Sequence, residues 1–490
     1  MTSSKSTKRA LITSALAILM CAAMLIGTTF AWFTDTASTG VNKIVSGNLK
    51  VDIIGADSDS HIEKLNFTKA ATTDAEAGAE ILWEPGCRYL TEGFRIANKG
   101  NLALKWKAQV NTGTTAANEG NFDLLDVIDF YLVTKAADGT ETETALDEFT
   151  GNLKKTETSD VYYIKGVMQT TAGNDYQGLT LDGISITVVA TQDTVESDSF
   201  DNQYDKDAEY PILVTTGDEL QAIVSNATAP VNIVLTNSIT TNNFVIPEDK
   251  DVTLDLNGRT VTNAGSHTIL NKGHLTLTDS SADKSGQIIS LKGNTAALRN
   301  GDNAVCVVEG GTISRDGANG NTWHVVENFG KMTFNGGKVV LKNGNGFAIT
   351  NGWNYFDPGA STTHAVMEIN ALELDTDSSG IKNCRYGDLT VNDVTVTSTG
   401  YWALSNDYLG TAVINGGTLT SNSFKAVSNG AAMTVNGGTF DGTEGLFVQS
   451  YATSTVLNGG TFANMNVDAL SSYVGTGHTA QQSGTSVIIK

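Results

Sequence analysis

A short repeated triplet constrains the fold of this 490-residue chain more than any other feature of the sequence. Asn-Gly-Gly occurs four times toward the C-terminal end, and related Asn, Asp or Glu positions extend the series back to residue 257. Neighbouring members lie 21 to 35 residues apart, a spacing that indicates a solenoid with occasional insertions. The series comprises Asn257, Asp279, Glu309, Asn335, Asn370, Asn392, Asn415, Asn436 and Asn458.

Apolar residues keep a constant phase with this series, because both the residue before each later asparagine and the fourth residue after it are apolar. Both positions must face one interior. Strands of three to five residues joined by turns need no helix within a period near 22 residues, so each repeat is predicted to be one coil of a parallel β-helix over 211–490. The pattern resembles the right-handed β-helix of the pectate-lyase-like superfamily. The residues that precede the asparagines are Phe334, Ile369, Val391, Ile414, Val435 and Leu457.

The triplet itself predicts the structure of one corner. Gly-Gly suits a tight turn in which the backbone adopts positive φ. Corners stacked at the rise of a β-sheet, about 4.8 Å, would bring the asparagine amides into hydrogen-bond range of one another. We therefore expect a ladder formed by Asn335, Asn370, Asn392, Asn415, Asn436 and Asn458.

The region before the repeats has a different pattern. Residues 32–200 contain short segments that alternate apolar and polar residues, separated by turn residues such as Pro85-Gly86 and Asp138-Gly139, and this is typical of a β-sandwich. Trp83 and Trp106 are expected in its core. The predicted strands are 49–54, 94–97, 102–110, 130–133 and 184–189.

An acidic segment separates the two regions. Residues 201–210 contain almost nothing apolar and are predicted to be an exposed linker. Beyond them, Thr216-Gly217-Asp218-Glu219 forms a capping-box pattern, which predicts one short amphipathic helix at the start of the solenoid. The fold class is therefore all-β, a sandwich followed by a solenoid.

The first 31 residues have the pattern of a signal peptide. Basic residues precede an apolar run from Leu11 to Ile26, and small residues at Thr29 and Ala31 predict cleavage before Trp32. The apolar run has 16 residues, fewer than the roughly 20 that a membrane-spanning helix needs, so a retained anchor is the weaker alternative. The last residues contain no wall-sorting motif, so covalent anchoring is not expected.

Several of these segments resemble the TasA/camelysin family. The similarity lies in the junction around Phe30-Ala31-Trp32-Phe33-Thr34-Asp35, in Gly47-Asn48-Leu49, and in Leu82-Trp83-Glu84-Pro85-Gly86. It continues in residues 96–105 and in the stretch Asn174-Asp175-Tyr176-Gln177-Gly178. The resemblance implies a jelly-roll domain and processing by a SipW-type signal peptidase. It also implies a secreted surface or biofilm-matrix protein of a Gram-positive bacterium.

Charge excludes one class of partner. The chain carries 31 basic and 53 acidic residues and a net charge of -22, which repels a phosphate backbone, so nucleic acid is not an expected partner. The six histidines form no close helical pair of the zinc-protease type. Cys87, Cys306 and Cys384 remain after processing, and we expect buried thiols rather than a disulfide between Cys306 and Cys384, which lie about three coils apart.

Carboxylates offer only weak candidates for metal binding or catalysis. Asp279 and Glu309 occupy the same corner of consecutive repeats, so a Ca²⁺ site is one possibility and a solvated pair of turn residues is the other. Glu373, Asp375 and Asp377 alternate along one predicted strand, but the next repeat offers threonines at the matching positions. We therefore expect an exposed polar strand, and neither a catalytic residue nor a cofactor is predicted.

Aromatic residues form the most distinctive candidate binding surface. They fall in an inserted loop and in the loop before the Asn415 corner, and insertions tend to emerge on one side of a solenoid. The first hypothesis is a non-enzymatic surface or matrix protein that self-assembles or binds matrix proteins or polysaccharide. The alternative is a polysaccharide lyase or glycoside hydrolase. The candidate binding residues are Trp353, Tyr355, Phe356, Tyr401, Trp402 and Tyr408.

Overall fold

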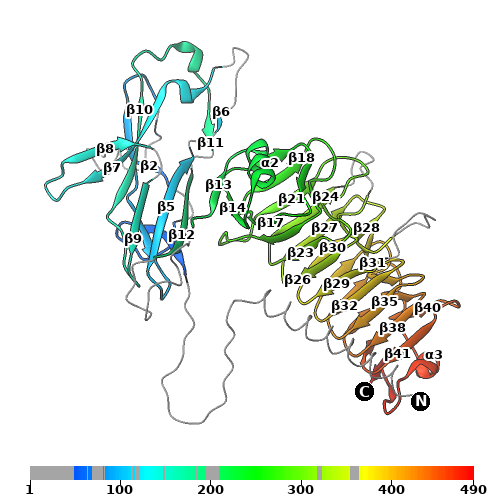
Figure 1. Ribbon diagram of the computed structural model, residues 1–490. Helices are drawn as coiled ribbons and strands as arrows, with labels where there is room; N and C mark the ends of the chain where they lie inside the picture. The colour runs from blue at the N-terminus through cyan, green and yellow to red at the C-terminus, as the bar shows by residue number, and fades with distance from the viewer. Residues whose placement is uncertain are drawn as a thin grey trace, which may run out of the picture. The chain divides into compact units, whose positions relative to one another are not determined.

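The computed structural model describes residues 49–62, 65–68, 81, 83–111, 114–115, 122–146, 149–182, 185–193, 209–316, 323–353 and 363–490 (Figure 1). The predicted cleavage site at Thr29, Ala31 and Trp32 lies outside these residues, as do Tyr355, Phe356 and most of the predicted linker. Within them, no helix is long and apolar enough to cross a membrane.

The N-terminal part consists of antiparallel sheets. The largest has seven strands, in the order β1-β4-β10-β3-β2, with β7 paired to β10 and β8 paired to β7. Its strands are β1 (Val51–Gly55), β2 (Phe67–Thr68), β3 (Arg88–Thr91), β4 (Phe94–Asn98), β7 (Ile128–Lys135), β8 (Glu141–Ala145) and β10 (Tyr162–Met168). The second is β12 (Ser185–Gln192), β5 (Leu104–Asn111) and β9 (Phe149–Leu153), and a small third pairs β6 (Thr114–Thr115) with β11 (Leu181–Asp182). Short 3₁₀ turns lie at Leu124–Asp126 (η1) and Asn174–Tyr176 (η2).

The two larger sheets share one apolar core. In β5 the buried residues alternate with polar ones, as a strand with one buried face requires, and Phe94 and Ile96 of β4 join Trp106 of β5 in the same cluster. Trp83 lies in a smaller cluster, where its ring meets those of Phe67 and Tyr89 edge-on. Both tryptophans therefore pack against apolar neighbours, as predicted.

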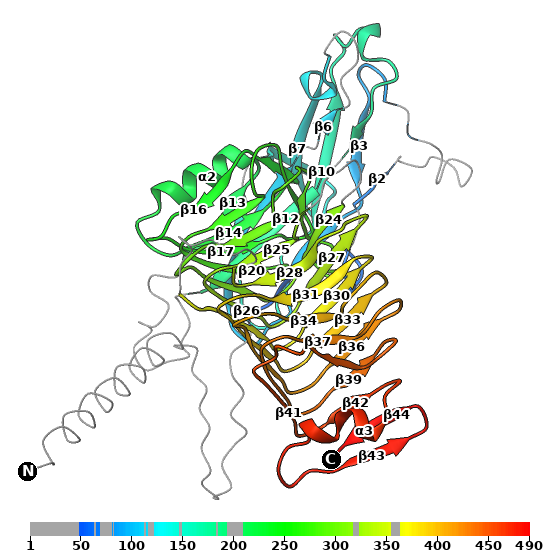
Figure 2. The same ribbon diagram turned by 90° about the vertical axis from the view of Figure 1, so that its right-hand side faces the viewer.

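The C-terminal part is the predicted parallel solenoid. Each coil contributes one strand to each of three parallel sheets, and residues in one strand pair with the equivalent residues one coil further on (Figures 1 and 2). Sheet 1 consists of β13 (Ile212–Val214), β14 (Val231–Leu235), β17 (Asp251–Asp255), β20 (His274–Thr278), β23 (Val305–Val308), β26 (Lys331–Phe334), β29 (Ala365–Ile369), β32 (Gly387–Val391), β35 (Thr411–Ile414), β38 (Ala432–Val435) and β41 (Ser454–Leu457).

The other two sheets follow sheet 1 in each coil. Sheet 2 consists of β15 (Ile239–Thr241), β18 (Thr260–Asn263), β21 (Gln287–Ser290), β24 (Thr312–Asp316), β27 (Lys338–Lys342), β30 (Glu373–Thr376), β33 (Thr395–Ser398), β36 (Thr418–Ser421), β39 (Thr439–Asp441) and β42 (Gly460–Phe462), with β44 (Ser486–Ile489) and β43 (Ala480–Ser483) at its end. Sheet 3 consists of β16 (Phe244–Ile246), β19 (Ile269–Asn271), β22 (Leu298–Asn300), β25 (Val326–Asn328), β28 (Phe347–Asn351), β31 (Ser379–Asn383), β34 (Leu404–Asn406), β37 (Val427–Asn429) and β40 (Leu446–Val448).

Side chains from all three sheets fill the interior as one continuous core. Equivalent residues stack from coil to coil, as Phe440 and Phe462 show with ring centroids 4.8 Å apart and planes inclined by 18°. This stacking explains the phase of the apolar residues, because a position four residues past the corner always returns to the interior of sheet 2.

Both ends of this core are covered. At the first coil, helix α2 (Gly217–Asn226) buries Leu220 and Val224, and the Thr216 hydroxyl caps it by accepting from the Glu219 amide. The side chain of Gln221 pairs with the backbone N–H and C=O of Val245 at the outer edge of sheet 3. At the last coil, α3 (Val467–Leu470), η4 (Ser471–Tyr473) and the antiparallel hairpin β43–β44 close the other end.

Candidate functional site

Six asparagines line the corner between sheets 1 and 2 in one hydrogen-bonded row. The side-chain Nδ2 of each donates to the Oδ1 of the asparagine one coil earlier, at 2.7 to 2.9 Å, except in the first of them, Asn335. Asn335 donates instead to Oε1 of Glu309, at 2.8 Å. These side chains are exposed or partly exposed. We call this row the outer ladder, and it contains Asn335, Asn370, Asn392, Asn415, Asn436 and Asn458.

The two glycines that follow four of these asparagines, Asn335, Asn415, Asn436 and Asn458, meet different requirements. The second has positive φ, as at Gly417 (95°) and Gly438 (103°). The first lies close to the preceding coil, and a Cβ at Gly437 would be 2.5 Å from the backbone oxygen of Asn415. The pair therefore reflects close approach as well as turn conformation.

The two corner carboxylates have structural partners. Asp279 is 2% exposed and accepts hydrogen bonds from the backbone N–H groups of Gly258 and Gly286, at 2.9 and 2.7 Å. It holds the turn together from inside, so the expectation of a solvated turn residue was wrong for Asp279. Glu309, which accepts from Asn335, forms the first rung of the outer ladder.

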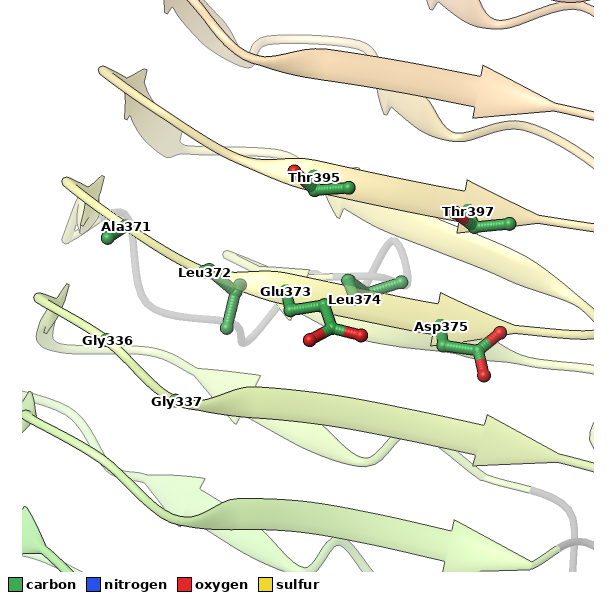
Figure 3. Close-up of a pocket in the computed structure, with 9 residues that line it drawn as sticks. All are labelled: Gly336, Gly337, Ala371, Leu372, Glu373, Leu374, Asp375, Thr395 and Thr397. Atoms are coloured by element: carbon green, nitrogen blue, oxygen red, sulfur yellow. The ribbon is translucent and has the colours of Figure 1, made fainter. Parts of the chain in front are cut away.

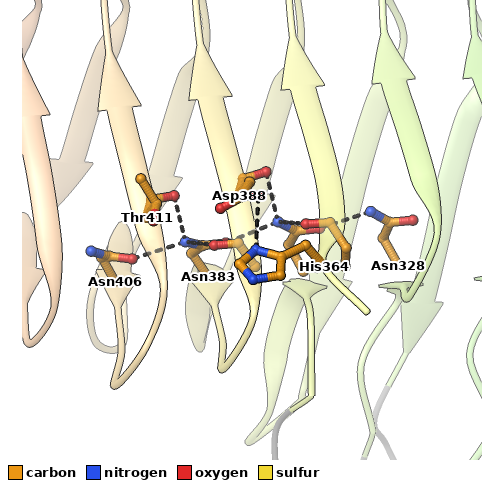
Figure 4. Close-up of polar contacts among 9 residues, drawn as sticks. Asn328, His364, Asn383, Asp388, Asn406 and Thr411 are labelled. Carbon is orange, nitrogen blue, oxygen red and sulfur yellow. Dashed lines mark hydrogen bonds and ion pairs between the residues drawn. The ribbon is translucent and has the colours of Figure 1, made fainter. Parts of the chain in front are cut away.

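A second asparagine ladder lies at the corner between sheets 3 and 1, and the sequence analysis did not find it (Figure 4). Each Nδ2 donates to the next Oδ1 at 2.7 to 2.9 Å, and the last donates to the Thr455 hydroxyl. Every asparagine in it is at most 1% exposed. We call it the inner ladder, and it contains Asn271, Asn300, Asn328, Asn351, Asn383, Asn406 and Asn429.

The inner ladder also satisfies backbone groups. Besides its neighbour in the ladder, Nδ2 of Asn383 donates to the backbone oxygens of Gly387 and Thr411, both at 2.9 Å. The signal for this ladder was present in the sequence as an apolar residue, any residue, then asparagine, as in Val326-Glu327-Asn328. This corner lacks the Gly-Gly pair that makes the outer corner easy to recognise in the sequence.

A shallow groove crosses the outer face of sheet 2 (Figure 3). It exists because Gly336 and Gly337 have no side chains beside the next strand, from which Glu373 and Asp375 project. Each carboxylate has a lysine partner on the preceding coil, since Lys338 lies 2.5 Å from Glu373 and Lys342 lies 2.8 Å from Asp375.

The third carboxylate of that strand pattern is bound differently. Asp377 accepts from the backbone N–H groups of Asn343 and Gly344. Thr395 and Thr397 occupy the matching positions of Glu373 and Asp375 on the next coil. The strand is thus a polar outer surface on which each acid has a lysine or backbone N–H partner. Within the described ranges, no group of three or more His, Cys, Asp or Glu could hold a metal ion.

The outer face of sheet 3 carries a row of polar side chains in register. The residues in register on successive strands are Arg299, Glu327, Thr350, Lys382, Ser405 and Ser428, and the apolar Phe447 ends the row. Glu327, Thr350 and Ser428 are at most 4% exposed. The charged members are paired. Arg299 lies 3.2 Å from Glu327, and Lys382 lies 3.1 Å from Asp407.

Glu327 is the most buried acid in this row, at 4% exposed. Its carboxylate accepts from the indole Nε1 of Trp323 at 3.0 Å as well as pairing with Arg299. Burial raises the pKa of Glu327, and the neighbouring Arg299 opposes that rise. The side chain of Glu327 is therefore held in sheet 3 by two donors, Trp323 and Arg299.

Two histidines lie beside the same wall in a neutral form. Burial, together with the nearby charges of Lys382 and Arg315, lowers the pKa of His324 to about 4. Its Nδ1 is 3.2 Å from both the backbone nitrogen and the carbonyl oxygen of Phe347. Burial likewise lowers the pKa of His267 to about 4, and its Nδ1 accepts from the Ala296 amide.

The described aromatic candidates fall on two opposite margins of sheet 3. Trp353 directly follows β28 and packs on Phe329 with centroids 4.6 Å apart, and Tyr408 follows β34 on the same margin. Tyr401 and Trp402 precede β34 and lie on the other margin. The structure therefore divides the predicted group into two rims with the polar row between them.

The rim containing Trp402 is an aromatic cluster that sequence analysis found only in part. The Trp402 ring stacks on Phe447 at 6.1 Å and meets Phe424 edge-on at 4.7 Å, while Tyr401 also meets Phe424. The Lys425 ammonium lies 3.5 Å from the Phe447 centroid. Only strand register brings Phe424 and Phe447 here from two later coils.

The three cysteines are free thiols. Cys306 and Cys384 are buried, as expected, and burial raises the pKa of each to about 12, so both are protonated at neutral pH. Cys87 is partly exposed.

Comparison with known proteins adds little to this geometry. No protein-family model and no curated protein matches the sequence. One solved structure, the catalytic domain of a GH87 alpha-1,3-glucanase in complex with tetrasaccharides, aligns at 11% identity over 84% of this chain and 96% of that chain, with a TM-score of 0.15. A TM-score this low says nothing about a common fold or activity.

Proposed function

We propose that the protein is an exported, non-enzymatic component of a bacterial surface or biofilm matrix. Its N-terminal domain would be a TasA-like jelly roll that mediates assembly. Its right-handed solenoid would present the outer face of sheet 3 to polysaccharide or another matrix component. The observation that carries the proposal is this face, on which a paired polar row runs between two aromatic rims.

Rings and hydrogen-bonding groups at regular spacing suit the binding of an extended polymer. Sugar rings have apolar faces that stack on aromatic side chains and hydroxyl edges that need polar partners. A stiff solenoid repeats the same arrangement along its axis. The export part of the proposal rests on the signal-peptide pattern and on the resemblance of the sequence around Ala31-Trp32 to TasA-like precursors.

The proposed assembly step is strand donation. Cleavage by a SipW-type peptidase would free the segment from Trp32 onward, and this segment would add to an open sheet edge of the next subunit. Blocking cleavage with Ala31→Arg should abolish filaments of the purified protein in electron microscopy, with Thr28→Ser as the control that leaves the cleavage positions intact. Filaments formed equally well by uncleaved protein would contradict this mechanism.

A specific observation keeps a second function under consideration. The groove on sheet 2 contains Glu373 and Asp375 on one strand, and paired carboxylates are the usual groups of glycoside hydrolases. The lysine partner of each acid favours the non-enzymatic proposal, because it stabilises the charged form. Incubation of the mature protein with pectic and host glycans, with and without Ca²⁺, distinguishes the two, since release of product that is lost in Glu373→Gln would establish the enzyme.

A further inference from the structure

Exposed aromatic side chains gather at one end of sheet 3. Among the described residues only three tyrosines are more than half exposed, namely Tyr401 (57%), Tyr408 (56%) and Tyr451 (55%). All three lie on loops that flank strands β34 to β40. Together with Trp402, Phe424 and Phe447 they form what we call the tyrosine patch.

Neighbouring groups hold two rings of the patch, those of Trp402 and Tyr451, in place. Trp402 is held between Phe424 and Phe447, and the ring of Tyr451 packs against Gly430, where a Cβ would come within 2.7 Å of it. Rings fixed in this way lose little conformational entropy when a ligand stacks on them. Between the rims, Ser405 is partly exposed, whereas Ser428 one coil further on is 3% exposed and accepts from the side chain of Gln449.

Charge on the patch selects the class of ligand. Lys425 is paired with Glu444 at 3.0 Å and lies over the Phe447 ring, and Lys382 nearby is paired with Asp407. Each of these cations therefore already has a carboxylate partner, and the whole chain carries a net charge of -22. An anionic polymer would gain little from such a surface and would be repelled at long range.

We propose that the tyrosine patch binds a neutral polysaccharide whose chain crosses sheet 3 from one margin to the other. Tyr401 and Trp402 precede β34 on one margin and Tyr451 follows β40 on the other, so a chain that crosses the sheet meets both groups of rings. Ring faces stack on Tyr401, Trp402 and Tyr451, and sugar hydroxyls bond to Ser405 and to the tyrosine hydroxyls. This inference rests on the proposed function and names the ligand class for its binding face.

The test is binding of the purified mature protein to insoluble polysaccharides. The neutral probes are cellulose, chitin, β-1,3-glucan and starch, and the anionic probe is polygalacturonate. We expect at least one neutral probe to retain the protein, with affinity unchanged by high salt. The double variant Tyr401→Ala/Tyr451→Ala should weaken that binding about tenfold or more, because two stacking rings are lost.

Matched variants separate the patch from general damage. Thr395→Ala/Thr418→Ala removes two side chains one coil apart on the outer face of sheet 2 and should leave binding unchanged. Tyr401→Phe/Tyr451→Phe keeps the rings and should retain most of it. An equal loss in the threonine variant, tighter binding to polygalacturonate, or binding to none of the neutral probes would overturn the inference.

Retention of the protein in a native matrix distinguishes failure of this inference from failure of the proposed function. If the tyrosine variant is retained as well as the parent protein while no neutral polysaccharide binds, the ligand class is wrong and the matrix role stands. If the parent protein forms no filaments and is not retained, the proposed function itself fails.

Discussion

The two asparagine ladders have the same amide-to-amide distances and very different surroundings. The inner ladder lies within the wall between sheets 3 and 1, whereas the outer ladder lines a corner that water reaches. An amide lost from an exposed row is replaced by water, but one lost from a buried row leaves its partners unsatisfied. Stability should therefore depend less on the outer ladder, which the sequence repeat reveals, than on the inner ladder, which it does not.

Ion pairs show the same contrast on neighbouring sheets. Arg299 and Glu327 meet in the buried wall of sheet 3, while Lys338 and Glu373 meet on the exposed face of sheet 2. The exposed pair is the closer one, at 2.5 Å against 3.2 Å, so a larger cost for breaking the buried pair would reflect burial and not distance.

The largest effect is expected for Arg299→Ala. It leaves the buried Glu327 with the Trp323 indole as hydrogen-bond donor and the Arg315 guanidinium as a nearby charge, and removing one partner of a buried ion pair costs about 3 kcal/mol or more. Urea unfolding followed by circular dichroism should show the loss. Lys338→Ala is the matched exposed variant and should cost less than about 1 kcal/mol. Equal costs for the two would remove the distinction.

Asn383→Ala is expected to cost about 2 to 3 kcal/mol, because it deprives the Oδ1 of Asn406 and two backbone oxygens of their donor. Asn383→Asp retains an acceptor but loses the donor, and it should be at least as destabilising. The measurement is again the free energy of unfolding. A loss below about 1 kcal/mol would mean that water enters the inner ladder.

The next largest effect is expected from acid pH, which should lower the free energy of unfolding through His324 beside the buried wall of sheet 3. The pKa of His324 is about 4 in the folded protein and about 6.5 when unfolded, so the unfolded chain takes up the proton first as pH falls. Its contribution is complete above pH 6.5 and declines toward pH 4, by about 2 kcal/mol at pH 5. Comparison of unfolding at pH 7 and pH 5 tests this, and His324→Gln should flatten that difference.

The smallest effect is expected for Asn415→Ala in the outer ladder. Its neighbours Asn392 and Asn436 are accessible to solvent and can bond to water, so the cost should be under about 1 kcal/mol. A double variant that adds Asn436→Ala should be nearly additive. A cost equal to that of Asn383→Ala would show that burial does not decide how much a ladder amide contributes to stability.

Local periodicity was enough to predict the solenoid. The apolar positions flanking Asn415 and Asn436 repeat in phase, and this phase dictates which side chains enter the core. The capping box at Thr216 and Glu219 was likewise predictable from the sequence, because its hydrogen bond joins two residues that are three apart.

The binding face could not be read in the same way. Phe424 and Phe447 reach Trp402 only through strand register, and the length of each inserted loop changes the sequence distance between them. Burial of Asp279 and Glu327 also depends on neighbouring coils, so sequence position alone suggested an exposed carboxylate in the first case and gave no signal in the second.

The capped ends and the regular rungs have a consequence for how such a gene changes over generations. Residues 415–435 form one complete winding, and their loss would join Ile414 to Asn436 with every rung still aligned. The helix at one end and the hairpin at the other would be untouched. The solenoid can therefore lengthen or shorten by duplication or deletion of single windings, while the terminal modules stay constant.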